Sequence, residues 1–221
     1  MDHQVINIPD VSLDVLYEDS FLAAIVKPAG VLVSGNKFKT IANALSYHLT
    51  KSGQGDACLP QPVHRLDFGT SGVLLCGKTQ SSIRKLNKMF ENKRMLKSYF
   101  AITAGQMPPS GCIDTPIDNK EALSYFEVIQ RIESKKYHCL NLVKLNPKTG
   151  RRHQLRKHLA SINHPVLGDQ AYGLKHISSK AKGLHLHSYS LEFIHPYTDE
   201  KISLVAPIPK RFKKWFPQKA Y

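Results

Sequence analysis

The chain has 221 residues, of which 42% are hydrophobic and 22% are charged. These proportions are ordinary for a globular protein and argue against a disordered chain, and the length allows one large domain or two small ones. Lysine and arginine number 31 against 17 acidic residues, which gives a formal net charge of +14. This excess favours a polyanionic partner such as RNA, DNA or an anionic membrane. A basic protein without such a partner is the alternative.

The sequence has no apolar run of about 18 residues that could form a transmembrane helix. Residues 1–12 lack the basic and apolar regions of a signal peptide. The four cysteines form no C-x-x-C pair, and their spacing suits neither a zinc site nor a disulfide framework. We therefore expect a cytoplasmic protein. His185 and His187 have no nearby acidic or cysteine partners, so they do not predict a metal site.

The first part of the chain combines extended segments with a helix. Residues 14–24 are expected to be one extended segment, followed by a turn at residues 27–30, KPAG. Residues 41–51 place apolar residues at helical spacing, which predicts an amphipathic helix.

A buried strand and a second helix are predicted next. The glycine-bounded apolar run at residues 72–77 predicts the strand. Thr79 or Ser81 can cap the following helix. The inner face of this helix carries Ile83, Leu86 and Phe90, and its outer face carries Arg84, Lys85 and Lys88. These three cations form either an ordinary solvated face or a phosphate-binding one.

The second half adds strand candidates at residues 99–103, 137–145 and 184–193, and a helix candidate at residues 152–162. Strands and helices follow one another at irregular intervals, without regular βαβ repeats. This pattern favours an α+β fold with a mixed, largely antiparallel sheet over a doubly wound fold.

The segment His64-Arg65-Leu66-Asp67 places an imidazole, a guanidinium and a carboxylate just before the predicted buried strand. Charged loops between buried elements often carry active sites, because the scaffold positions them. Turn capping, or a salt bridge between Asp67 and Arg65, is the structural alternative. The same letters resemble two protein-kinase motifs, but one aspartate would have to serve both. No glycine-rich or Walker motif is present, so we reject a kinase.

A second basic segment, GRRHQLRKHLA at residues 150–160, places Arg151, Arg152 and His153 near the start of a predicted helix. Positive charge there opposes the helix dipole at a cost of up to about 1 kcal/mol. This cost favours a functional role, although an amphipathic helix with a solvated charged side is the alternative.

Two aromatic features each allow more than one interpretation. Tyr99 is either a core residue or a group that stacks on a base or acts as acid or base. The tail at residues 209–216 interleaves basic and aromatic residues, which suits RNA or a membrane surface. The alternative is a terminal helix that docks its aromatic residues into the core.

Taken together, these segments resemble the RluA-type pseudouridine synthases. The resemblance rests on HRLDFGTSGVLL (64–75), KSYFAITAG (97–105) and GRRHQLRKHLASINHPVLGDQAYG (150–173). Residues 17–30 and 184–196 support it. The segments occur in the family's order and span most of the chain. Two positions depart from the family pattern, because Arg152 stands where Thr or Ser is more usual and Ser188 where Ala is.

The resemblance implies the pseudouridine synthase fold, an α+β fold with flanking helices and an active-site cleft across a mixed, mostly antiparallel sheet. It implies neither a metal nor an organic cofactor. We expect residues 1–221 to form a single catalytic domain without the S4 RNA-binding domain that many members carry. We also expect a monomer that binds RNA and no membrane.

The resemblance further implies an isomerase that converts uridine in rRNA or tRNA to pseudouridine. Asp67 matches the essential aspartate, and either attack on the sugar or removal of a sugar proton stays open. Arg156 matches its basic partner, and Tyr99 matches a tyrosine that stacks on the base or takes the C5 proton. Arg65 matches the residue that fills the space left by the flipped nucleotide.

The RNA-binding candidates are Arg65, His64, Arg151, Arg152, His153 and Lys97. A non-catalytic RNA-binding or RNA-folding protein on the same scaffold is the alternative function. The presence of Asp67, Arg156 and Tyr99 together favours the enzyme.

Overall fold

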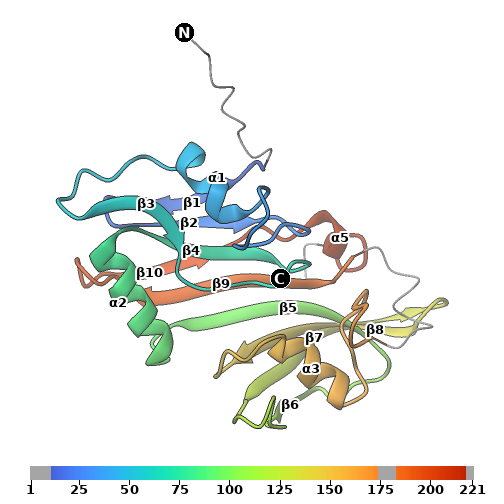
Figure 1. Cartoon of the computed structure of the whole chain (residues 1–221). Coiled ribbons are helices and arrows are strands. Elements are labelled where there is room, and N and C mark those ends of the chain that lie inside the picture. The colour runs from blue at the N-terminus through green and yellow to red at the C-terminus, as the bar shows by residue number, and fades with distance from the viewer. Residues whose placement is uncertain (1–10, 174–182, 218–221) are drawn as a thin grey trace.

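The computed structural model describes residues 11–173 and 183–217. Its strands form one sheet in the order β1-β2-β4-β9-β5-β8-β7-β6, with β3 paired to β4 and β10 paired to β9 (Figure 1). The strands are β1 (Asp14–Glu18), β2 (Leu22–Lys27), β3 (Ala57–Pro62), β4 (Ser71–Thr79), β5 (Leu96–Ala104), β6 (Ser110–Ile113), β7 (Ser124–Ser134), β8 (His138–Pro147), β9 (Leu186–Ile194) and β10 (Lys201–Val205). The described helices are α1 (Ile41–His48), α2 (Gln80–Glu91), α3 (Gln154–Ser161) and α5 (Lys210–Lys213).

The sheet is mixed, as the sequence predicted. β4 and β9 pair in parallel, and the other strand pairs of the sheet are antiparallel. The expected α+β class with a mostly antiparallel sheet is therefore confirmed.

Residues 14–24 do not form one extended segment. They fold into the antiparallel hairpin of β1 and β2, which pairs Asp14 with Val26. The chain reverses where the Asp19 carboxylate accepts hydrogen bonds from the backbone N–H groups of Phe21 and Leu22, at 2.6 and 2.8 Å. An aspartate that satisfies nearby backbone donors in this way stabilises a turn, so the prediction of one continuous segment was wrong.

The predicted helices form, but their ends differ from the expected ones. α1 ends at His48 rather than at residue 51. Thr79 caps α2 in a capping box with Ser82, as one of the two expected caps. α3 starts at Gln154 rather than at residue 152, because His153 has a φ of 56° and lies in the left-handed region.

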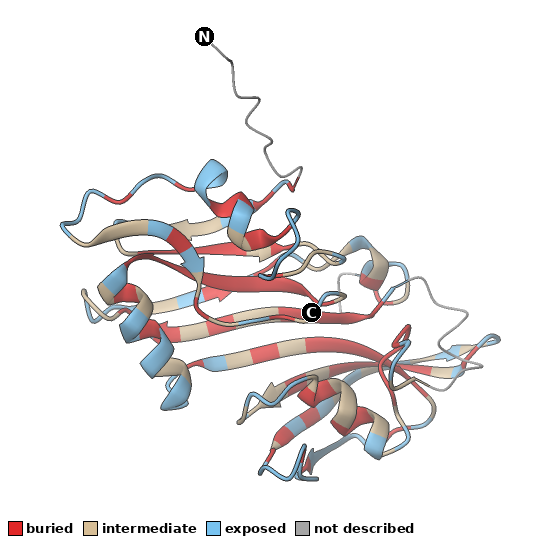
Figure 2. Cartoon of the chain, viewed as in Figure 1, coloured by how far each residue is buried: buried red, intermediate tan, exposed pale blue. Residues whose placement is uncertain are grey.

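Helices cover both faces of the sheet. On the β2–β4 half, α1 packs with one set of alternate strand residues and α2 with the other. On the β5–β8 half, α3 packs on Val143 and Leu145, and the segment beginning with α5 packs on Leu140 and Leu142. Successive residues of β8 point to opposite faces, so α3 and α5 lie on opposite sides of the sheet. Figure 2 shows that β4 is buried along its whole length and that β5 and β9 are buried over much of theirs.

The parallel junction of β4 and β9 requires a glycine. Gly72 has a φ of 116°, and a Cβ atom there would lie 2.0 Å from the backbone oxygen of Ser188. Any larger residue would force the two strands apart. This close contact positions the start of β4, directly after the loop that carries Asp67.

Candidate active site

The Asp67 loop connects β3 to β4 and is held at several points. Leu66 is buried in the α1-side core. The backbone N–H of Thr70 donates to the Asp67 carbonyl at 3.0 Å. The Nε2 atom of His64 accepts from the N–H of Leu75 at 2.9 Å. Burial lowers the pKa of His64 to about 3, so its ring is neutral and ties the loop to β4.

Lys27, at the end of β2, holds the same loop from beneath. Its side chain is fully buried, and Nζ donates to the carbonyl oxygens of Pro28, Phe68 and Thr70 at 2.8, 3.3 and 2.8 Å. Burial lowers its pKa to about 8, although the Asp67 charge opposes that shift. The sequence predicts Lys27 only as part of a turn and not as a support of this loop. A lysine that ends the apolar strand sequence LAAIVK was the signal that could have revealed it.

Arg156 approaches Asp67 from α3. Its Nη1 atom donates to Oδ2 of Asp67 at 3.2 Å. Its Nε and Nη2 atoms donate to the two oxygens of Asp169 at 2.7 and 2.8 Å. The guanidinium therefore links the two carboxylates and can rotate little between them.

Asp169 is the buried support of this arrangement. Its side chain is fully buried and also accepts the backbone N–H groups of Ala171 and Tyr172. Burial would raise its pKa, but the hydrogen bonds from Arg156 and the backbone lower it overall. Asp169 is not among the site residues predicted from the sequence. The paired charge becomes visible only when the loop that carries Asp169 folds against α3.

His153 lies on the other side of Asp67. Its Nε2 atom is 3.7 Å from Oδ1 of Asp67, and its Nδ1 atom shares a hydrogen bond with the Tyr172 hydroxyl at 3.0 Å. Burial lowers the pKa of His153, and neighbouring arginines lower it further, against the opposing effect of Asp67. The ring is therefore neutral at pH 7.

Tyr99 comes from β5 and completes the group. Burial raises the pKa of its phenol to about 12, and the nearby Asp67 charge raises it further, against a hydrogen bond with Ser188 that lowers it. Tyr99 is therefore protonated at neutral pH. Both Tyr99 and Asp67 line the same cleft.

The cleft has a volume of about 970 Å³ and brings together all nine candidate residues of the sequence analysis. Eight lysines and arginines line it against three carboxylates, so its walls are strongly cationic. A cationic cleft of this kind concentrates a polyanion.

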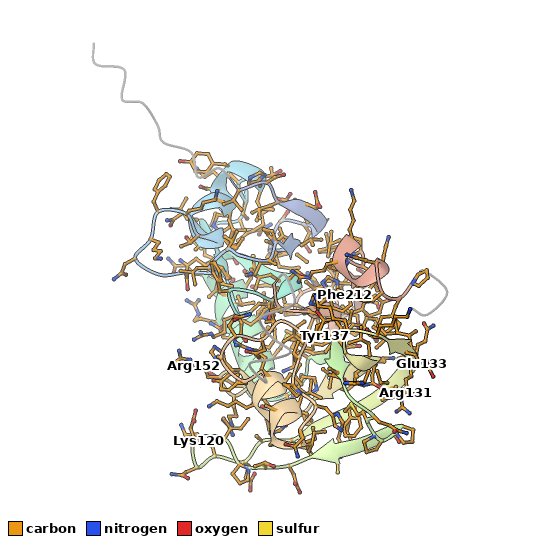
Figure 3. The ribbon with its side chains drawn as sticks, turned by 90° about the vertical axis from the view of Figure 1, so that its right-hand side faces the viewer. Lys120, Arg131, Glu133, Tyr137, Arg152 and Phe212 are labelled. Atoms are coloured by element: carbon orange, nitrogen blue, oxygen red, sulfur yellow. The ribbon has the colours of Figure 1, made fainter. Side chains whose placement is uncertain are left out.

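Figure 3 places Arg152 on one side of the molecule and Phe212 on the other, so the tail lies away from Arg152.

The predicted RNA-binding residues differ in exposure. Arg65, Arg151 and Arg152 are exposed at the rim, and Nε of Arg151 donates to the Glu121 carbonyl at 2.9 Å. Lys97 is half-buried, and burial lowers its pKa. The exposed arginines can therefore meet a large ligand, whereas the ring of His64 already accepts a backbone hydrogen bond.

The C-terminal tail docks into the core. Phe212 and Phe216 are fully buried, and Trp215 contacts Tyr137 edge-on with ring centroids 5.8 Å apart. The docking alternative for this segment thus agrees with the structure. No helix among the described residues is long and apolar enough to cross a membrane.

Comparisons with known proteins agree with this site. A family model described as RNA pseudouridylate synthase matches residues 22–161, more than half of the chain. A tRNA pseudouridine synthase C of Haemophilus ducreyi is 31% identical, over 94% of this chain and 96% of the relative. A ribosomal large subunit pseudouridine synthase D of Borreliella burgdorferi is 36% identical, over 92% of this chain and 67% of the relative.

A solved structure shares the fold. Human RNA pseudouridylate synthase domain containing 1 matches with a TM-score of 0.75 at 23% identity, over 90% of this chain and 84% of that one. The chain therefore belongs to the RNA pseudouridylate synthase family and is an isomerase that acts on RNA.

Proposed function

We propose that Asp67 is the essential carboxylate of this enzyme and that its substrate is a uridine in rRNA or tRNA. The observation that carries the proposal is the 3.2 Å contact between Arg156 Nη1 and Asp67 Oδ2 in a cationic cleft. The guanidinium fixes the position of the carboxylate through a charge-assisted hydrogen bond. Either route, attack on the sugar or removal of a sugar proton, requires an Asp67 carboxylate that is held in place beside the substrate.

The cleft can receive only an extruded nucleotide, since a stacked uridine is inaccessible inside a helix. Flipping costs a few kcal/mol. Arg65 is exposed at the mouth, where its planar guanidinium can stack in the vacated space. Arg151, Arg152 and Lys97 line the cleft and are proposed to contact phosphates, which gives affinity without sequence choice.

The two oxygens of Asp67 have different surroundings. Oδ2 accepts a hydrogen bond from Arg156 at 3.2 Å, whereas Oδ1 lies 3.7 Å from Nε2 of His153, beyond hydrogen-bond distance. We assign Oδ1 as the reacting atom, because it is not held by the guanidinium. The N1–C1′ bond then breaks, the uracil rotates, and a C5–C1′ bond forms. The proton on C5 leaves last, to solvent, and N1 takes up a proton from solvent, so that the base gains and loses no atom overall.

Tyr99 is assigned to hold the uracil rather than to take that proton. A phenol with a pKa of about 12 is a poor source of the phenolate that proton abstraction needs. Its ring offers a flat surface beside Asp67 on which a base can stack. The pKa therefore favours stacking between the two roles left open by the sequence.

The alternative of a non-catalytic RNA-binding protein is not favoured, because the family is enzymatic and Arg156 contacts Asp67, the residue we propose as essential. We further propose that the chain acts as one catalytic domain and as a monomer. The free cysteines, none of them in a disulfide, support a reducing, cytoplasmic location. The names of the relatives support both tRNA and rRNA as substrate classes.

Turnover by an Asp67→Asn variant tests the proposal. Total RNA labelled with [5-³H]uridine is prepared from cells that lack the protein, and release of tritium to water reports loss of the C5 hydrogen. We expect the variant to release tritium at least about 10²-fold more slowly, because the group that acts on the sugar is gone. RNA affinity and the melting temperature should stay close to wild type. Normal tritium release by Asp67→Asn would overturn the assignment.

A further inference from the structure

The end of α2 carries an unbalanced positive charge. Residues 84–97 contain six lysines and arginines and a single acidic residue, Glu91. Arg84 and Lys88 are one helical turn apart and both exposed. Like charges at this spacing destabilise a helix by a few tenths of a kcal/mol. A helix face selected only for stability would alternate its charges, so this face points to a ligand.

Lys93, just after α2, has a strained backbone. Its N–H donates to the Phe90 carbonyl at 3.1 Å, and the N–H of Arg94 donates to the Met89 carbonyl at 2.9 Å. These bonds close the helix with Lys93 in the left-handed region, at a φ of 56°. Glycine is the usual residue at this position, because a side chain there costs about 1 kcal/mol.

Among the described residues, Lys93 differs in type from the other residues with a side chain that have a positive φ. The other positive-φ residues are Asp118, Asn119, His138, His153, Asn163 and Asp199. Asn, Asp and His adopt this conformation more readily than other residues with side chains. A lysine where glycine would be less strained indicates that its side chain has a use.

Lys93 lies at the cleft, where a cation can meet a bound polyanion. Lys93 is exposed and lines the cleft together with Lys97. Lys88, Lys93 and Arg94 form no ion pair within residues 11–173 and 183–217. Lys85 differs, because its Nζ atom lies 3.7 Å from the Tyr197 ring centroid and donates to a backbone carbonyl. Figure 1 shows α2 running down to the start of β5.

We propose that Lys88, Lys93 and Arg94 bind phosphates of the RNA strand that flanks the target uridine. The cleft holds the flipped nucleotide, and the exposed end of α2 extends the binding site along the strand. This inference rests on the proposed function, because it takes RNA to be the ligand of the cleft. It adds a site outside the catalytic group, so Asp67 chemistry and flanking contacts are tested separately.

A Lys93→Gly variant tests the contribution of the side chain to RNA binding. Glycine removes the charge and also relieves the backbone strain, so the fold should not be destabilised. The probe is a fluorescein-labelled oligouridylate of 20 nucleotides, bound at increasing salt and followed by anisotropy. We expect affinity to fall several-fold at low salt. The slope of log K against log salt should fall by about 0.7, the value for one phosphate contact on a single strand. The melting temperature should not decrease by more than a few degrees.

Two further variants provide controls. Lys93→Arg keeps the charge and should bind nearly as wild type. Asn163→Gly relieves the same backbone conformation away from the cleft and should leave RNA binding unchanged. In the tritium assay, Lys93→Gly should raise KM for labelled RNA and leave kcat near wild type. Unchanged affinity and salt slope in Lys93→Gly would overturn the inference, as would an equal loss in Lys93→Arg or Asn163→Gly.

An inactive Asp67→Asn enzyme that still loses affinity on Lys93→Gly would support the flanking site on its own. If the wild type is active and Lys93→Gly has the same RNA affinity and the same KM, the flanking site is refuted and the catalytic proposal stays intact. The two proposals can therefore fail independently.

Discussion

The segment that leads into α3 and the C-terminal segment around α5 have similar sequences and different roles. Both mix several basic residues with large apolar ones. In the first, the apolar residues Leu155 and Leu159 are buried and the cations meet in the cleft. In the second, Phe212 and Phe216 fill the core, and Nη2 of Arg211 donates inward to the Ser71 hydroxyl at 3.0 Å.

The difference shows which property of a basic segment indicates function. The cations of the α3 segment stand at a helix start, where they oppose the dipole, and His153 adopts a strained backbone beside them. The lysines of α5 bear no comparable cost, because this helix of four residues, Lys210–Lys213, is about one turn long and has little dipole for them to oppose. Charge that destabilises its own element is therefore a better sign of a ligand than charge alone.

Arg156→Lys should produce the largest effect within the α3 segment. Lysine keeps the charge but cannot reach Asp67 and both oxygens of Asp169 together, as the guanidinium does. Loss of one preorganised donor typically costs about 10²–10³ in kcat, and we expect a fall of that order in tritium release. Arg156→Ala is a poorer choice, because it leaves Asp169 as an unpaired buried carboxylate at about 3–5 kcal/mol. Wild-type kcat in a folded Arg156→Lys enzyme would contradict the role of Arg156.

Phe212→Ala should produce the opposite phenotype in the α5 segment. Its side chain is fully buried, so truncation should destabilise the fold by about 3–5 kcal/mol. Denaturant unfolding measures this change, and kcat of the folded fraction at low temperature should stay near wild type.

A matched pair of lysine and arginine variants sharpens the contrast. Lys210, Lys213 and Lys214 are exposed, so replacing all three with glutamine should change RNA affinity little. Replacing Arg151 and Arg152 with glutamine should weaken it more, although fewer charges are removed. Equal losses from the two sets would mean that the tail binds RNA as strongly as the cleft rim does.

Regular, strongly patterned elements were predictable from the sequence. The buried run at residues 72–77 lies within β4, and the inner face of α2 was correct, because both depend on local spacing. β7 was not predicted. Its exposed and half-buried residues alternate along most of its length, and its pairing with β6 and β8 depends on distant residues.

The site was predictable where residues carry their own signature and not where they act through folding. Asp67 and Arg156 stood out through charged segments that resemble a known family. Asp169 and Lys27 did not, because each depends on burial against a different segment of the chain. Asp169 holds Arg156 and Lys27 holds the Asp67 loop, and a sequence shows such support only after the loops have been placed.

His153→Asn should produce the smallest change in activity. The lowered pKa of His153 sets the direction of the expected change in the pH dependence of kcat/KM. His153 stays neutral as the pH falls from 8 to its usual pKa of 6.5, and protonates only below that value. The imidazolium would then pair with Oδ1 of Asp67, the oxygen we assign as the reacting atom. We therefore expect kcat/KM of the wild type to decline below pH 6.5. Asparagine tolerates the left-handed backbone and does not titrate, so the decline should begin at lower pH in the variant.

Folding also responds to this proton, and that response must be separated from catalysis. The unfolded chain binds a proton at His153 at higher pH than the folded chain does, so the folded state loses stability as the pH falls below 6.5. Melting temperatures at each pH identify the range in which both enzymes stay folded. Within that range, identical acid limbs for wild type and His153→Asn would show that His153 does not control Asp67. A shifted limb with unchanged RNA affinity would instead assign His153 to the reaction rather than to RNA binding.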